Sequence, residues 1–142
     1  MNKTFLLLVA ITLASCGSTQ VNSLSNTNLY EVITQQQYGG ASIEFYEILS
    51  EPSEIKMLLN DPNLKGKINT NDLNQANFII LNMGEKPTGG YSIGISTIAE
   101  TADAIVIKVK NTNPDPGSIV TQALTNPFCV VKINSKKEIQ FK

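Results

Sequence analysis

Apolar and polar residues alternate through much of the second half of the chain, which is the pattern of β-strands with one buried face. Residues 91–96 and 105–110 follow this period of two, whereas residues 78–81 are continuously apolar, as expected for a strand buried on both faces. Further strands are predicted at residues 29–33, 41–49, 119–124, 128–133 and 138–141.

A different period interrupts this pattern after residue 50. Ile55, Leu58 and Leu59 are spaced three and four residues apart, which predicts a short helix with one apolar stripe. Pro52 suits the first turn of this helix, and the Asn-Asp-Pro segment at residues 60–62 ends it.

Residues 70–77 form either another helical turn or a loop. Several short strands with one or two short helices in the N-terminal half predict a mainly β fold, either a small immunoglobulin-like β-sandwich or a half-open barrel. A chain of 142 residues suits a single hydrophobic core, so we expect one β-rich domain over residues 29–142.

Residues 1–15 have the features of a secretion signal. Lys3 precedes an apolar run over residues 5–13 that is too short to span a bilayer as a stable helix. Residues 13–16, Leu-Ala-Ser-Cys, resemble the bacterial lipobox, in which the cysteine is acylated and becomes the new N-terminus. The alternative is an ordinary secretory peptide cut near the same place, with Cys16 incidental.

An acylated Cys16 would anchor the protein to a membrane, because several acyl chains hold far more firmly than one. Residues 16–28 are rich in Ser, Thr and Asn and would then form a tether. Gly17 and Ser18 place no acidic residue after the cysteine, which favours the outer membrane in a two-membrane bacterium. We therefore expect a lipid-anchored protein of the cell envelope.

The charge balance argues against a nucleic-acid partner, because 11 basic and 12 acidic residues leave a net charge of -1 and no basic face. The chain has no His, which is a common zinc ligand and the usual proton-transfer group near neutral pH. No loop has the oxygen-rich spacing of a calcium site. We expect neither a metal nor another cofactor.

Catalysis would have to rely on carboxylates or on a thiol. The carboxylates are scattered, and Glu44 and Glu47 are predicted to point to opposite faces of one strand. A hydrolase built on two carboxylates is therefore a remote alternative. Cys129 is either a reactive thiol or a small buried hydrophobe, and the absence of His favours the second reading. We expect no enzymatic activity.

The segment MGEKPTGGY at residues 83–91 joins two predicted strands. Pro87 has a fixed φ, and Gly89 and Gly90 are free to take positive φ. If packing holds such a loop still, it loses little entropy on binding a partner, to which Tyr91 would offer an amphipathic side chain. The alternative is a plain hairpin turn with Tyr91 in the core.

Two blocks, residues 84–93 and 122–133, resemble the C-terminal domain of the PrcB family, named for a lipoprotein subunit of a bacterial surface protease complex. The resemblance extends from about Asn77 to Lys142, and residues 17–76 resemble no family that we can name. It implies a non-enzymatic β domain that associates with a protease or another envelope protein and can stabilise it.

A fainter resemblance is to chagasin-type inhibitors of cysteine proteases, which carry three loops at one end of an immunoglobulin-like sandwich. Their loops read Asn-Pro-Thr-Thr-Gly-Tyr, a glycine-rich turn, and Arg-Pro-aromatic. The corresponding segments here are Lys86-Pro87-Thr88-Gly89-Gly90-Tyr91, Pro116-Gly117-Ser118 and Asn126-Pro127-Phe128. In the first segment Lys86 replaces Asn and Gly89 replaces Thr, the second lacks the glycine pair, and in the third Asn126 replaces Arg. This resemblance implies three loops that meet at one end, with protease inhibition as the alternative function.

The sequence thus predicts protein binding through loops at residues 85–91, 114–118 and 125–128. The expected partner is an envelope protein such as a protease, to which rigid loops would present side chains including Thr88, Tyr91 and Phe128. The residues predicted to form the binding loops are Lys86, Pro87, Thr88, Gly89, Gly90, Tyr91, Pro116, Gly117, Asn126, Pro127 and Phe128.

Overall fold

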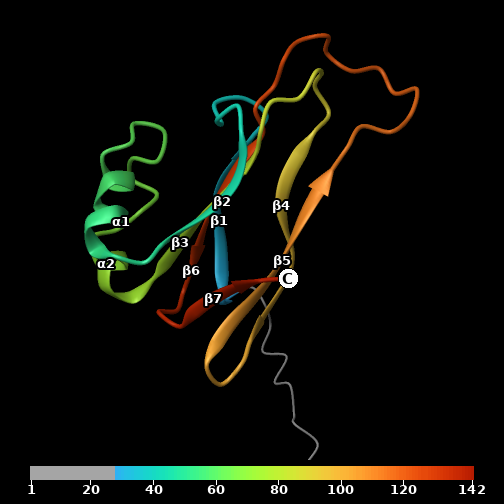
Figure 1. Ribbon diagram of the computed structural model, residues 1–142. Helices are drawn as coiled ribbons and strands as arrows, with labels where there is room; N and C mark the ends of the chain where they lie inside the picture. Colours follow the sequence, from blue (N-terminus) through green and yellow to red (C-terminus); the bar gives the residue numbers. More distant parts are fainter. Residues whose placement is uncertain (1–27) are drawn as a thin grey trace, which may run out of the picture.

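The computed structural model describes residues 28–142, which form two β-sheets and two short helices (Figure 1). The strands are β1 (Tyr30–Gln36), β2 (Glu44–Leu49), β3 (Asn77–Met83), β4 (Ser92–Glu100), β5 (Ala104–Thr112), β6 (Phe128–Ile133) and β7 (Glu138–Phe141). The helices are α1 (Pro52–Leu59) and α2 (Asp72–Gln75).

The N-terminal predictions lie outside the described residues. These are the signal peptide at residues 1–15, the acylation of Cys16, and the tether over residues 16–28 apart from its last residue. Within residues 28–142, neither helix has the length and apolar character needed to cross a membrane.

The predicted mainly β fold is confirmed, and its two separate sheets correspond to a small sandwich. The first sheet has the strand order β1-β6-β3-β2 and the second has the order β4-β5-β7. Neighbouring strands are antiparallel except for β5 and β7, which run parallel.

The main hydrophobic core lies between the two sheets, because each strand directs alternate side chains toward the opposite sheet. Ile79 and Leu81 of β3 face Ile105 and Ile107 of β5 across this core, and all four are fully buried. Phe78, the neighbour of Ile79, is buried on the other face of the first sheet. The prediction that this strand is buried on both faces is therefore confirmed.

The helices form a third layer, on the outer face of the first sheet (Figure 1). Helix α1 places Ile55 and Leu58 against that face, as its apolar spacing predicts. At the start of α1, the carboxylate of Glu54 accepts hydrogen bonds from the backbone N–H groups of Ser50 and Glu51, both at 3.1 Å. This capping fixes where the chain leaves β2 and turns over the sheet.

The strand predicted at residues 119–124 does not form. The chain between β5 and β6 is instead a long irregular arm, which we define as residues 113–127 (Figure 1). No neighbouring strand within the described chain offers residues 119–124 a ladder. Apolar composition alone therefore misidentified this segment.

Candidate functional site

Three loops come together at one end of the sandwich, which we call the loop end: residues 37–43, residues 84–91 and the arm (Figure 1). Lys86 and Thr125 exchange both backbone hydrogen bonds, at 2.8 and 3.0 Å. The N–H of Gly89 donates to the carbonyl of Thr121 at 2.9 Å. The loop at residues 84–91 therefore braces the base of the arm.

Gly90 allows the loop and the arm to approach closely. Its φ is 88°, and a Cβ atom at this position would lie 2.8 Å from the Cβ of Pro114. The predicted positive φ is thus found at Gly90, but not at Gly89. Nearby, the buried hydroxyl of Thr125 donates to the carbonyl of Thr88 at 2.8 Å, which closes the contact.

The loop at residues 37–43 is fastened by Asn82, which is 1% exposed within the apolar strand β3. Its side-chain amide donates to the carbonyls of Ala41 and Ile43, and its Oδ1 accepts from the N–H of Ala41 at 2.9 Å. A buried polar side chain with all these partners gives the loop one conformation.

The same loop is joined directly to the end of the arm. Gly40 N–H donates to the carbonyl of Asn126, and Asn126 N–H donates to the carbonyl of Gln37, both at 3.0 Å. The loop at residues 37–43 was not among the site loops predicted from the sequence. The usable signal was Asn82, an isolated polar residue in an apolar strand, together with the turn-forming pair Gly39-Gly40.

The structure brings the predicted site residues to the loop end but buries several of them. Gly89 and Pro127 are buried. Half-buried residues are Lys86, Thr88, Tyr91, Asn126 and Phe128, and the exposed ones are Pro87, Gly90, Pro116 and Gly117. Tyr91 packs against the core between the sheets, and Phe128 packs with the cluster beneath the helices.

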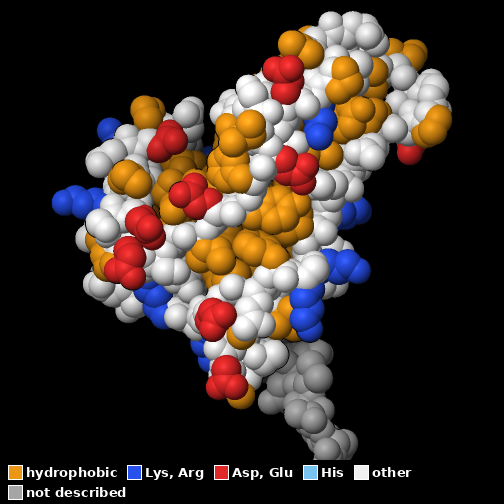
Figure 2. All heavy atoms as spheres, in the orientation of Figure 1, with side chains coloured by type: hydrophobic (Ala, Val, Ile, Leu, Met, Phe, Trp, Pro, Cys, Tyr) orange, Lys and Arg blue, Asp and Glu red, His pale blue; other side chains and the backbone are white. Residues whose placement is uncertain are grey.

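Two other apolar side chains project from the arm instead. Ile119 is fully exposed and Leu124 is 61% exposed, and Figure 2 shows hydrophobic side chains over the protruding loop end. Asp115 is the one charged residue in the arm. The arm therefore presents a nearly uncharged surface with exposed aliphatic groups.

Strands β3 to β6, the loop at residues 84–91 and the arm form one continuous part of the chain. One family model, described as PrcB C-terminal, covers this part. Residues 77–134 match the PrcB C-terminal family. The match confirms the predicted resemblance, although it ends at Asn134 rather than at Lys142. No curated protein and no solved structure matches the chain.

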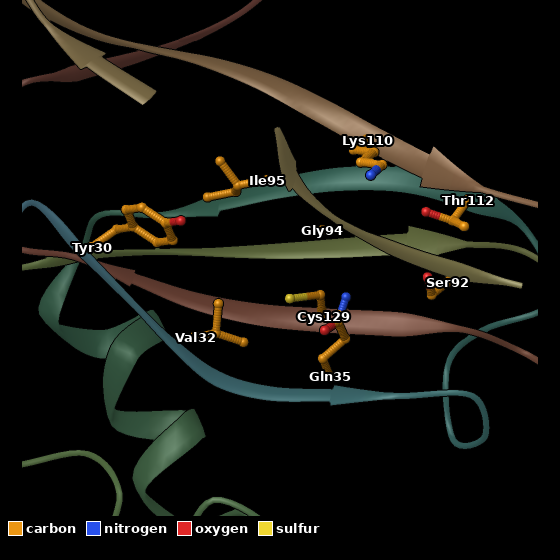
Figure 3. Close-up of a pocket in the computed structure, with 9 residues that line it drawn as sticks. All are labelled: Tyr30, Val32, Gln35, Ser92, Gly94, Ile95, Lys110, Thr112 and Cys129. Atoms are coloured by element: carbon orange, nitrogen blue, oxygen red, sulfur yellow. The ribbon is translucent and has the colours of Figure 1, made fainter. Parts of the chain in front are cut away.

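Residues 77–134 supply most of a small pocket of about 220 Å³ between β1 and β4 (Figure 3). Gln35 of β1 spans one side of the pocket, where its Nε2 donates to the carbonyl of Ile93 at 2.8 Å. The lining residues are Tyr30, Val32, Gln35, Ser92, Gly94, Ile95, Lys110, Thr112 and Cys129. They offer hydroxyl, amide, amine and thiol groups but no carboxylate.

Cys129 is fully buried, as the structural reading of the sequence predicted. Burial raises the pKa of its thiol from 9.0 to about 11, so the thiol stays protonated near neutral pH. Glu44 and Glu47 lie on opposite faces of β2, opposite Met83 and Ile80 respectively, which confirms their predicted separation. Within residues 28–142, no three His, Cys, Asp or Glu side chains gather as a metal-binding group.

The buried thiol predicts a loss of stability in alkaline solution. The unfolded chain releases the Cys129 proton near pH 9, whereas the folded chain holds it until about pH 11, so stability is complete below pH 9 and falls as the pH rises between these values. Relative to a Cys129→Ala variant, the parent should lose about 2 kcal/mol of unfolding free energy between pH 8 and pH 11. Urea unfolding of both proteins at each pH measures this difference, and parallel pH curves would contradict it.

Proposed function

We propose that this protein is a lipid-anchored envelope lipoprotein whose domain binds another protein, as an accessory or stabilising subunit of a protease or other envelope complex. The PrcB C-terminal match supports this role. The observation that carries the proposal is the braced arm with Ile119 and Leu124 exposed. Exposed aliphatic groups with little charge are characteristic of the centre of a protein interface.

Binding in this proposal is passive and does not require a chemical step. The arm is held at its base by Lys86–Thr125 pairing and by the Gly89–Thr121 hydrogen bond, so part of its ordering cost is already met in the free protein. Ile119 and Leu124 would enter apolar depressions on the partner, while Pro87 borders the contact. Tyr91 and Phe128 hold the scaffold rather than the partner.

Site-specific photocrosslinking tests this proposal in the intact envelope. A benzophenone amino acid replaces Ile119 in one full-length variant and Met57 in a matched control; both positions are exposed apolar residues, and Met57 lies on α1 away from the loop end. We expect one envelope protein to be crosslinked from position 119 and not from position 57. Equal crosslinking from both positions, or none from position 119, would refute binding through the arm.

The membrane anchor has a separate test. We expect a Cys16→Ser variant to leave the membrane fraction, because it lacks the thiol that carries the acyl chains. Membrane fractionation with detection of the full chain measures this, and a Ser23→Thr variant, which leaves the Leu-Ala-Ser-Cys motif intact, serves as the control. Unchanged membrane association of Cys16→Ser would contradict acylation at this position.

Protease inhibition is a second candidate, favoured by the meeting of the predicted first and third loops through the Lys86–Thr125 pair. An inhibitor would insert the exposed Pro87 edge and the neighbouring arm into the active-site cleft of a papain-like or serine protease. The full chain should then slow such a protease at a one-to-one ratio. Full protease activity in the presence of a large excess of the protein would eliminate this candidate.

A further inference from the structure

Strand β5 has one edge that is only half covered. Strand β7 pairs with β5 from Ala104 to Ile107 and ends there. Within residues 28–142, no strand pairs with residues 108–112 on that side, although β4 continues along the opposite side to Thr112. A five-residue edge is therefore open, with a length of about 17 Å.

The open edge presents backbone hydrogen-bonding groups. The carbonyl of Ile107 accepts the N–H of Lys142 at 2.9 Å, so the backbone groups of Ile107 point toward the β7 side. Because backbone groups two residues apart in a strand point to the same side, the N–H and C=O groups of Val109 and Asn111 point to the open edge. They are placed to pair with one further strand.

An apolar surface adjoins this edge. Tyr46 and Ile48 of β2 lie on the face that points toward the second sheet, yet they are 37% and 36% exposed because β7 is too short to cover them. The Tyr46 ring packs against Phe141 of β7, with ring centroids 5.5 Å apart. Figure 2 shows hydrophobic side chains gathered between β2 and β5. An added strand beside β5 would cover this surface with its inward side chains.

The outer face of the same edge is basic. Lys108 and Lys110 are exposed on the face opposite Val109, and neither forms an ion pair within the described chain. Pairing of two copies through this edge would place lysine opposite lysine in an antiparallel register centred on Val109 or on Lys110, which is unfavourable. The charges instead favour a segment with acidic outward residues.

We infer that the edge of β5 at residues 108–112 receives an extended segment of a partner protein in which apolar residues alternate with Asp or Glu. The segment adds a strand to the second sheet, places its apolar residues over Tyr46, and places its acidic residues beside Lys108 and Lys110. This inference rests on the proposed protein-binding role, but it uses a surface distinct from Ile119 and Leu124, so the two can fail separately.

Three fluorescein-labelled nonapeptides test the inference by fluorescence anisotropy with the full chain. One peptide alternates Val and Glu, one alternates Val and Lys, and one has the Val–Glu composition interrupted by three Pro residues. We expect the Val–Glu peptide to bind at least about tenfold more tightly than either other peptide, because only it offers both the strand hydrogen bonds and the charge. Equal binding of the Val–Glu and Val–Lys peptides, or no binding of either, would overturn the inference.

Variants of the chain then locate the site. Lys108→Glu combined with Lys110→Glu should reverse the preference toward the Val–Lys peptide, and Asn111→Pro should weaken Val–Glu binding about tenfold because it removes one N–H from the open edge. Met57→Ser, at an exposed position on α1, is the control and should leave peptide affinity unchanged. Unchanged affinity in the double variant, with an unfolding midpoint equal to that of the parent, would also overturn the inference. If position 119 gives no crosslink but the Val–Glu peptide still binds, binding through the arm is refuted, whereas the inference about the β5 edge is retained.

Discussion

An Asp72→Ala substitution is expected to lower the free energy of unfolding by about 3 kcal/mol, because it leaves a nearly buried lysine without its partner. The carboxylate of Asp72 lies 2.7 Å from the ammonium of Lys132, and the two side chains are only 9% and 15% exposed. The other carboxylate oxygen of Asp72 accepts a hydrogen bond from the backbone N–H of Asn69 at 2.9 Å, which fixes the chain where it enters α2. Chemical denaturation followed by circular dichroism measures the loss.

A second ion pair in the same chain provides the matched control. Lys137 and Glu100 lie 2.9 Å apart, but their side chains are 35% and 40% exposed. Glu100→Ala should therefore cost less than about 1 kcal/mol. Replacing both members of the buried pair, as Asp72→Leu with Lys132→Met, should recover much of the stability lost in Asp72→Ala. Equal losses for Asp72→Ala and Glu100→Ala would show that burial is not the cause.

A Gly40→Ala substitution is expected to lower the free energy of unfolding by about 3 kcal/mol and to loosen the loop end. A Cβ atom at Gly40 would lie 2.3 Å from Oδ1 of Asn82 and 2.6 Å from the carbonyl of Asn126. The backbone must then move, which breaks the Gly40–Asn126 hydrogen bond and disturbs the buried Asn82 amide. Chemical denaturation measures the cost, and crosslinking from position 119 should fall with it.

Gly66→Ala separates this steric effect from a general cost of replacing a loop glycine. Gly66 has a φ of 79°, but a Cβ atom there would meet nothing within 4 Å. Its substitution should therefore cost about 1 kcal/mol, from backbone strain alone, and leave crosslinking unchanged. A Gly40→Ala variant as stable as Gly66→Ala would contradict the close packing at the loop end.

Regular patterning made much of the sandwich predictable. The inward sets of β4 and β5, the two-sided burial of β3 and the apolar stripe of α1 follow from periods of 2 and 3.6 residues. The predicted strand beginning at Ala41 starts instead at Glu44, because Asn82 captures the backbone of Ala41 and Ile43. That capture depends on a residue about forty positions away, which local pattern cannot include.

The exposed face of the loop end was less predictable. Tyr91 and Phe128 were expected to meet a partner, but each finds a hydrophobic cluster within reach and packs there. Ile119 and Leu124 were expected in a strand, yet they lie on an arm that finds no neighbouring strand to pair with among residues 28–142. Apolar character was correctly read at all four positions, but which of them face solvent depends on what else is nearby in space.

The sequence by itself determined a mainly β chain with one or two short helices, a resemblance to the PrcB C-terminal family, and a Pro-Thr-Gly-Gly loop between two strands, because periodicity and motif are local properties of the chain. Only the tertiary structure decided that this loop braces an arm and that Asn82 fastens the loop at residues 37–43. It also decided that, within residues 28–142, no strand pairs with the basic edge of β5 at residues 108–112. These features arise from contacts between distant residues, whose geometry is set when the two sheets pack together.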